Sequence, residues 1–224
     1  MLLAIDIGNT HIVTGLLDNT GNVLLTFRVA SNDKLTEDEY FSYLRNISKF
    51  NKIDIEKING MIVASVVPNL NPTGFGADRI IDIVQSLNDY PDKNLVIFDF
   101  GSATTYEVLE KNIYIGGGIL PGIEMSINAL FANTAKLPKV KFSTPDSVLG
   151  KNTIEQIQAG IFYGYAGQIK HIIKKIKEVV KDPFIIATGG LGKILSAEIE
   201  EIDVYSPDLS IKGLYTLYKY NQNL

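Results

Sequence analysis

The sequence predicts an α/β protein of two similar domains, each a mixed sheet flanked by helices, with a cleft between them. Two observations lead to this fold class. A unit of strands joined by tight turns and followed by helical segments occurs twice, and each copy carries an Asp-x-Gly turn after its first strand, at Asp6 and again at Asp99. A Rossmann domain would need a helix directly after its first strand, so the tight turns exclude that fold.

The first copy is predicted from apolar runs and turn residues. Residues 2–7, 11–17 and 23–30 have the length and composition of strands, and a polar turn at 18–22 joins the last two into an antiparallel meander. Thr36-Glu37-Asp38-Glu39 has the pattern of a capping box, and apolar residues at helical spacing follow it to Phe50. A buried strand at 61–67 and a helix at 79–88 complete the copy.

The second copy repeats this order. Strands are predicted at 95–100, 105–109 and 113–120, helices at 122–135 and 153–180, and a strand at 183–187. Thr188-Gly189-Gly190 then opens a final helix–strand–helix section. The polar stretch Tyr90-Pro91-Asp92 marks the boundary, so we expect domains at residues 1–90 and 91–224.

The composition excludes several classes of protein. The net charge of −4 argues against a nucleic-acid binder that depends on a basic surface, and the moderate charge content argues against disorder. The absence of cysteine excludes disulfides and thiolate metal sites. No apolar stretch is long enough for a membrane helix, and the N-terminus lacks the features of a signal peptide. We therefore expect a cytoplasmic protein without nucleic-acid or membrane partners.

The repeated turns indicate phosphate binding. Glycine lets a backbone approach a ligand closely, and consecutive N–H groups in such a turn cradle anionic oxygens. An aspartate beside that cradle would repel phosphate unless a cation lay between them, and Mg²⁺ binds in this way. Two facing copies would hold a nucleoside triphosphate across the cleft. For either turn alone, the alternative is that Asp6 or Asp99 merely begins a turn.

Eight segments extend the pattern over nearly the whole chain. They are DIGNTHIV (6–13), ASVVPN (64–69), GADR (76–79), FDFGSATT (98–105), IGGGILPG (115–122), LGKNT (149–153), GIFYGY (160–165) and ATGG (187–190). In this order they resemble the type III pantothenate kinases, a family of the actin-like ATPase and sugar-kinase superfamily. The resemblance implies two ribonuclease H-like domains and a dimeric enzyme that uses ATP to convert pantothenate to 4'-phosphopantothenate, the first step of coenzyme A biosynthesis.

The resemblance also implies a role for individual residues. Asp78 is similar to the family's catalytic base, Asp6 lies near the magnesium ion, and Asp99 resembles the ligand of a monovalent cation, K⁺ or NH₄⁺. Substrate binding is implied for Gly76, Ala77, Asp78, Arg79 and Thr153. ATP binding is implied for Asp6, Ile7, Gly8, Asn9, Thr10, His11, Ile12, Val13, Gly101, Ser102, Gly189 and Gly190. Ser102 stands where the family usually has threonine, and both hydroxyls can donate to phosphate.

The chain departs from the family pattern before the GADR motif. The family has a substantial segment there, whereas residues 69–75 are all that separates Pro68 from Gly76. Either the protein has lost the segment or the sequence omits it, and pantothenate contacts from the segment are unassigned. A loss that removed the acceptor pocket would leave a non-catalytic nucleotide-binding protein. A kinase for another small hydroxyl substrate is a third alternative.

Three features have structural alternatives. Asp78 could simply cap the helix that follows it, and Thr153 with Gln156 fits a capping box. Gly160, Gly164 and Gly167 lie on similar faces of one predicted helix, where each glycine costs about 1 kcal/mol. Close packing against another helix would explain them, either within the chain or across a dimer interface.

Overall fold

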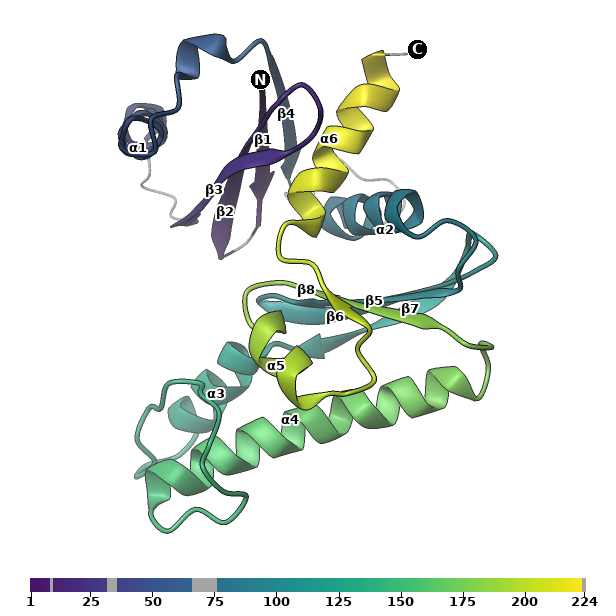
Figure 1. The fold of residues 1–224 in the computed structure, drawn as a ribbon. Coiled ribbons are helices and arrows are strands. Elements are labelled where there is room, and N and C mark those ends of the chain that lie inside the picture. The colour runs from purple at the N-terminus through teal and green to yellow at the C-terminus, as the bar shows by residue number, and fades with distance from the viewer. Residues whose placement is uncertain (9, 32–35, 66–75, 223–224) are drawn as a thin grey trace. The chain divides into compact units, whose positions relative to one another are not determined.

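The computed structural model describes residues 1–8, 10–31, 36–65 and 76–222. Within it the chain forms two compact units (Figure 1). The first unit contains Met1–Asp89 together with Asp208–Leu224, and the second contains Tyr90–Pro207. Each unit is built around its own sheet, as the two-domain prediction requires.

The first unit is built on a four-stranded sheet in the order β3-β2-β1-β4. β1 pairs antiparallel with β2 and parallel with β4, and β2 pairs antiparallel with β3. The turn between β2 and β3 is fixed by the carboxylate of Asp18, which accepts hydrogen bonds from the backbone N–H groups of Thr20 and Asn22. The strands are β1 (Leu2–Ile7), β2 (His11–Leu17), β3 (Val23–Ala30) and β4 (Gly60–Ser65).

Helices cover both faces of this sheet because alternate residues of β1 point to opposite sides. Leu3 and Ile5 pack in a cluster with Leu44 of α1, whereas Leu2 and Ala4 pack with residues of α2 and α6. Thr36 caps α1 in the predicted capping box with Glu39. The helices of this unit are α1 (Glu37–Phe50), the 3-10 turn η1 (Ile55–Lys57), α2 (Ala77–Asp89) and α6 (Leu209–Gln222).

The second unit repeats the strand order of the first. Its sheet has the order β7-β6-β5-β8-β9, so its first four strands match β3-β2-β1-β4 in order and in direction, and the predicted duplication is confirmed. Helices α3, α4 and α5 contribute apolar side chains to one core with β5 and β8. The elements are β5 (Leu95–Phe100), β6 (Ala103–Glu110), β7 (Ile113–Pro121), α3 (Ile123–Ala132), α4 (Thr153–Lys177), β8 (Phe184–Thr188), α5 (Gly192–Glu198) and β9 (Val204–Tyr205).

The C-terminal helix departs from the predicted division at residue 90. We expected residues 91–224 to form one domain, but the chain from Asp208 onward belongs to the first unit. The physical reason is the apolar face of α6: Ile211 and Leu214 are buried in the same cluster as Leu2 of β1 and Ile81 of α2. The division of the chain at Asp89/Tyr90 lies one residue from the predicted boundary.

Candidate functional site

The first group of candidate residues centres on Asp6, near the end of β1. The carboxyl group is largely enclosed, and its Oδ1 atom accepts no hydrogen bond from the described part of the chain. Burial raises the pKa of Asp6 to about 6, the negative charge of Asp78 adds to this effect, and the guanidinium of Arg28 opposes it. An enclosed carboxylate oxygen without a donor suits a bound cation, so Asp6 fits the role of a magnesium ligand.

Arg28 reaches this group through the register of the sheet. Asp6 lies opposite Val13 of β2, and Val13 lies opposite Arg28 of β3, so the three residues form one row across the strands. Residues paired in this way point to the same face of a sheet. Sequence reasoning did not select Arg28 as a site residue. Its rarity, as one of only three arginines, was the available signal.

The turn between β1 and β2 holds the first predicted phosphate loop. The Gly8 N–H donates to the carbonyl of His11 at 3.0 Å, and a Cβ on Gly8 would lie 3.0 Å from that same oxygen. Ser31 braces the turn: its hydroxyl donates to the Gly8 carbonyl at 2.6 Å, and its N–H donates to the Thr10 carbonyl at 2.8 Å. The Gly8 N–H is therefore engaged within the hairpin, and Asn9 lies outside the described residues.

The other predicted loop residues continue the two strands, with Ile7 ending β1 and His11, Ile12 and Val13 beginning β2.

The GADR segment forms the start of α2. Asp78 is the second residue of the helix rather than its N-cap, and its Oδ1 accepts a hydrogen bond from the Arg79 N–H at 2.9 Å. A Cβ on Gly76 would lie 2.3 Å from that same oxygen, so only glycine leaves room for the carboxylate to fold back. Ala77 begins the helix, and Arg79 is half-buried in its first turn. The structure thus places Asp78 within electrostatic reach of Asp6.

The second group of candidates surrounds Asp99, near the end of β5. A Cβ on Gly189 would lie 2.4 Å from Oδ1 of Asp99, and a Cβ on Gly101 would lie 3.3 Å from Oδ2. Gly189 also has a φ of +86°, which favours glycine. Asp99 is paired in the sheet with Thr188 of β8, which places the Thr-Gly-Gly turn directly beside it.

One backbone hydrogen bond joins the two turns of this group, and the side chain of Tyr205 contacts the second turn. The Leu191 N–H donates to the Phe100 carbonyl at 3.5 Å, and the Tyr205 hydroxyl donates to the Gly189 carbonyl at 3.1 Å. A Cβ on Gly122, the residue before α3, would lie 2.0 Å from the Ser102 carbonyl oxygen. The structure therefore brings Asp99, Gly101, Ser102, Gly189 and Gly190 together. Gly122 was part of a recognised motif but had been given no role.

Thr153 is the first residue of α4, beside α3 in the second unit (Figure 1). The capping box that we considered for Thr153 and Gln156 is wrong. Asn152 caps the helix instead, accepting from the Glu155 N–H at 3.1 Å and donating to the Glu155 carboxylate at 2.7 Å. The Thr153 side chain is exposed and forms no hydrogen bond with the rest of the described chain.

Across the ranges that the structure describes, no three or more His, Cys, Asp or Glu side chains cluster to hold a metal ion. A Mg²⁺ ion bound by one or two carboxylates, with nucleotide oxygens and water as its other ligands, needs no such cluster. Among the described helices, none has the length and hydropathy to cross a membrane.

Comparisons with known proteins connect both groups to one family. The family model described as type III pantothenate kinase matches residues 2–74 and 70–175. The type III pantothenate kinase of Fusobacterium nucleatum subsp. nucleatum is 60% identical over 256 residues, covering 99% of this chain and 100% of the relative. The two family matches overlap at residues 70–74, inside the short segment 69–75. This segment lies outside the described residues.

Solved structures confirm the predicted fold class. The activator of the 2-hydroxyisocaproyl-CoA dehydratase from Clostridium difficile, solved with bound ADPNP, is similar with a TM-score of 0.61 and 14% identity, covering 99% of this chain and 96% of that one. A ROK family glucokinase from Streptomyces griseus, in complex with glucose and AMPPNP, gives a TM-score of 0.50 and 12% identity, with coverage of 96% and 98%. These likenesses concern the fold alone. Together with the match across both Asp-x-Gly turns, the sequence relationships show that the chain belongs to the type III pantothenate kinase family.

Proposed function

We propose that this protein transfers the γ-phosphoryl group of ATP to the primary hydroxyl of pantothenate, giving 4'-phosphopantothenate and ADP in the first step of coenzyme A biosynthesis. The observation that carries the proposal is the 60% identity to a type III pantothenate kinase, which extends over 99% of the chain. Both Asp-x-Gly turns and the GADR segment lie inside the family match. Such a reaction is expected in the cytoplasm, where ATP and the precursor are available.

Asp78 is the proposed general base. The pantothenate hydroxyl oxygen attacks the γ-phosphorus, the bond from that phosphorus to the β-phosphate bridging oxygen breaks, and ADP leaves. The hydroxyl proton passes to Asp78, and Oδ2 is the oxygen to receive it because Oδ1 accepts the Arg79 N–H. A carboxylate within reach of the hydroxyl is what a general base requires. Gly76, Ala77 and Arg79 would bind the acceptor, with the Arg79 guanidinium facing the pantothenate carboxylate.

Asp6 and the first turn are proposed to bind the triphosphate through Mg²⁺. The enclosed Oδ1 of Asp6 would coordinate the ion, directly or through water, and Gly8, Asn9 and Thr10 would line the phosphates. The bound Mg²⁺ supplies charge neutralisation as the phosphoryl group is transferred. Arg28 shares a face of the sheet with Asp6. We therefore add it as a residue whose positive charge stabilises negative charge at this position.

Asp99 and the second pair of turns are proposed to complete the nucleotide site. The carboxylate, packed between Gly101 and Gly189, would bind K⁺ or NH₄⁺, while Ser102 contacts a phosphate and Gly189-Gly190 border the adenosine. The open hydroxyl of Thr153 is suited to contact pantothenate. We propose that both groups of residues contribute to binding ATP.

A homodimer is part of the proposal, and α4 supplies the support. A Cβ placed on Gly160, Gly164 or Gly167 meets no described atom within 4 Å, so packing against the described part of the same chain does not explain these glycines. Each costs about 1 kcal/mol in a helix interior, and close approach by the α4 helix of a second copy would offset that cost.

A coupled assay of ADP release tests the function. We expect turnover that requires pantothenate and that falls severalfold when Na⁺ replaces K⁺. Nucleotide binding without turnover on any acceptor would favour the non-catalytic alternative, and turnover only with another hydroxyl compound would change the substrate. Equal rates in K⁺ and Na⁺ would contradict the assignment of Asp99.

A further inference from the structure

One face of α2 carries polar side chains along its whole length. Asp78, Asp82, Gln85 and Asp89 are spaced by four, three and four residues, so they lie on one side of the helix. Asp82 is 3% exposed and Gln85 is 4% exposed. Buried polar groups are costly unless hydrogen bonds compensate them, so their partners explain why this face is not apolar.

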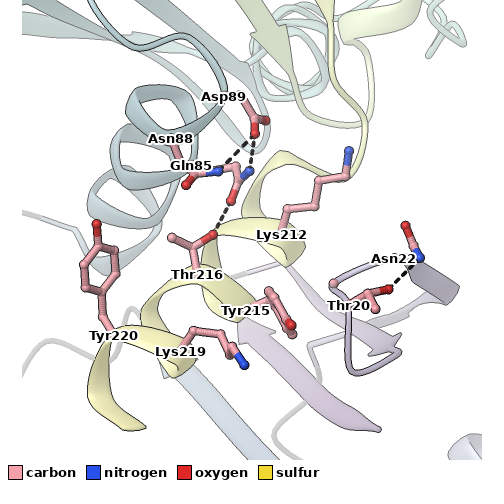
Figure 2. A pocket seen from close by; sticks show the side chains of 11 residues that line it. Thr20, Asn22, Gln85, Asn88, Asp89, Lys212, Tyr215, Thr216, Lys219 and Tyr220 are labelled. Atoms are coloured by element: carbon pink, nitrogen blue, oxygen red, sulfur yellow. Dashed lines mark hydrogen bonds between the residues drawn. The ribbon is translucent and has the colours of Figure 1, made fainter. Parts of the chain in front are cut away.

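Two of the partners lie on α6. The Ser210 hydroxyl donates to Oδ1 of Asp82 at 2.7 Å, and the Thr216 hydroxyl donates to Oε1 of Gln85 at 2.7 Å. Gln85 extends this hydrogen-bond network along α2, because its Nε2 donates to Asp89 at 2.7 Å. Figure 2 shows the Thr216–Gln85–Asp89 chain in the wall of a pocket of about 470 Å³.

The two helix backbones approach closely at Gly213, which lies between Ser210 and Thr216 in α6. A Cβ on Gly213 would lie 2.4 Å from the carbonyl oxygen of Ile81, so glycine is what permits this approach. Apolar contacts such as Ile81 with Leu214 bury surface but allow rotation and sliding. Directional hydrogen bonds on either side of the contact fix both the rotation and the axial position of α2.

We propose that Ser210 and Asp82 are positioning residues for phosphoryl transfer: their hydrogen bond holds the first turns of α2 so that the Asp78 carboxylate lies where the acceptor hydroxyl must lose its proton. The inference rests on the proposed function. Asp82 is one helical turn from Asp78, whereas Gln85 is two turns away, so the two bonds from α6 differ in their distance from the reacting end of the helix.

Matched variants separate positioning from packing. Ser210→Ala removes the hydrogen bond near Asp78, and Thr216→Val removes an equally short bond farther along the same helix pair. We expect Ser210→Ala to lower kcat about tenfold, with KM for ATP unchanged within twofold, because small displacements of a reacting group are costly. Both variants are expected to lower the melting temperature by a similar amount. Thr216→Val is expected to leave kcat within twofold. Ser210→Thr, which keeps the hydroxyl, is expected to restore turnover.

Equal losses of kcat in Ser210→Ala and Thr216→Val, or no loss in either, would overturn the proposal. Amide hydrogen exchange gives a readout that does not depend on activity. Ser210→Ala is expected to speed exchange at the first turn of α2, including the Ile80 N–H that donates to Gly76, whereas Thr216→Val is expected to affect the last turn. If wild-type protein shows no turnover with pantothenate, the proposed function fails. The exchange pattern then still decides whether Ser210 holds the start of the helix.

Discussion

At the scale of single residues, the approach of Asp6 to Asp78 is the most informative feature of the molecule. The charge of Asp78 contributes to raising the pKa of Asp6, so the two ionised carboxylates destabilise each other. Arg28 relieves the repulsion only in part. A bound cation would relieve it more fully, which explains physically why the arrangement suits a nucleotide enzyme.

Asp78→Asn is expected to fold normally, to bind ATP and to lose between about a hundredfold and ten-thousandfold of turnover, since a general base contributes on this scale. Kinetic assay with pantothenate measures the loss, and calorimetry measures nucleotide affinity. Asp38→Asn is the matched control, because Asp38 is also the second residue of its helix and is exposed. Near-normal turnover of Asp78→Asn would remove Asp78 from the mechanism.

The raised pKa of Asp6 predicts a dependence of stability on pH. Because the pKa of Asp6 is about 6 in the folded protein, against 3.8 for an ordinary aspartate, the folded state binds more protons than the unfolded chain between these values. Ionisation of Asp6 therefore costs stability as the pH rises through this range. Without metal, Asp6→Asn is expected to be more stable than wild type, by an amount about 1 kcal/mol larger at pH 8 than at pH 5.

Urea unfolding of both proteins at the two pH values checks this prediction. A difference that stays constant with pH would contradict the raised pKa. Adding Mg²⁺ and ATP is expected to stabilise wild type and not Asp6→Asn.

At the scale of elements, the glycines of α4 lower its helix propensity, and contacts within the described part of the chain do not offset that cost. Its three glycines face open space in the described chain, so alanine at these positions is expected to stabilise the isolated helix. A larger side chain would instead obstruct a second copy. Alanine is therefore expected to stabilise the fold, whereas a larger side chain is expected to weaken association.

Gly164→Leu is therefore expected to weaken dimerisation at least tenfold while leaving the fold intact, since the side chain would occupy the space needed by a partner helix. Sedimentation equilibrium measures the association, and circular dichroism verifies the helix. Lys174→Leu, on the same helix, controls for added apolar surface. A Gly164→Leu protein that associates like wild type would place the dimer interface elsewhere.

At the scale of the whole molecule, the C-terminal helix α6 belongs to the first unit and packs against the N-terminal strand β1. Leu214 is 1% exposed and packs in the core of the first unit, whereas Leu195 is fully buried in the core of the second. We expect Leu214→Ala to destabilise the first unit by about 2–5 kcal/mol, and Leu195→Ala to destabilise the second by a similar amount.

Hydrogen exchange resolves the two units. Leu214→Ala is expected to speed exchange in β1 and not in β5, and Leu195→Ala to do the reverse. Equal acceleration in both strands by either variant would show that the units unfold together.

The sequence by itself determined the features that depend on neighbouring residues. Strands 2–7, 11–17, 23–30 and 95–100 were predicted with the bounds that the structure has, because period and turn chemistry act within a few residues. The capping box at Thr36 and the repeated unit of three strands joined by tight turns follow from the same local signals. The motifs also identified the family, which the comparisons confirm.

Only the tertiary structure decided the contacts between distant parts of the chain. The membership of α6 in the first unit depends on which apolar faces fit together, and many pairings of faces satisfy the same periodicity. The row from Asp6 to Arg28 exists because register aligns three strands, and the burial of the Asp6 carboxyl group and the nearby charge of Asp78 depend on how the elements pack. Burial and long-range charge are properties of the packed molecule, so no local pattern contains them.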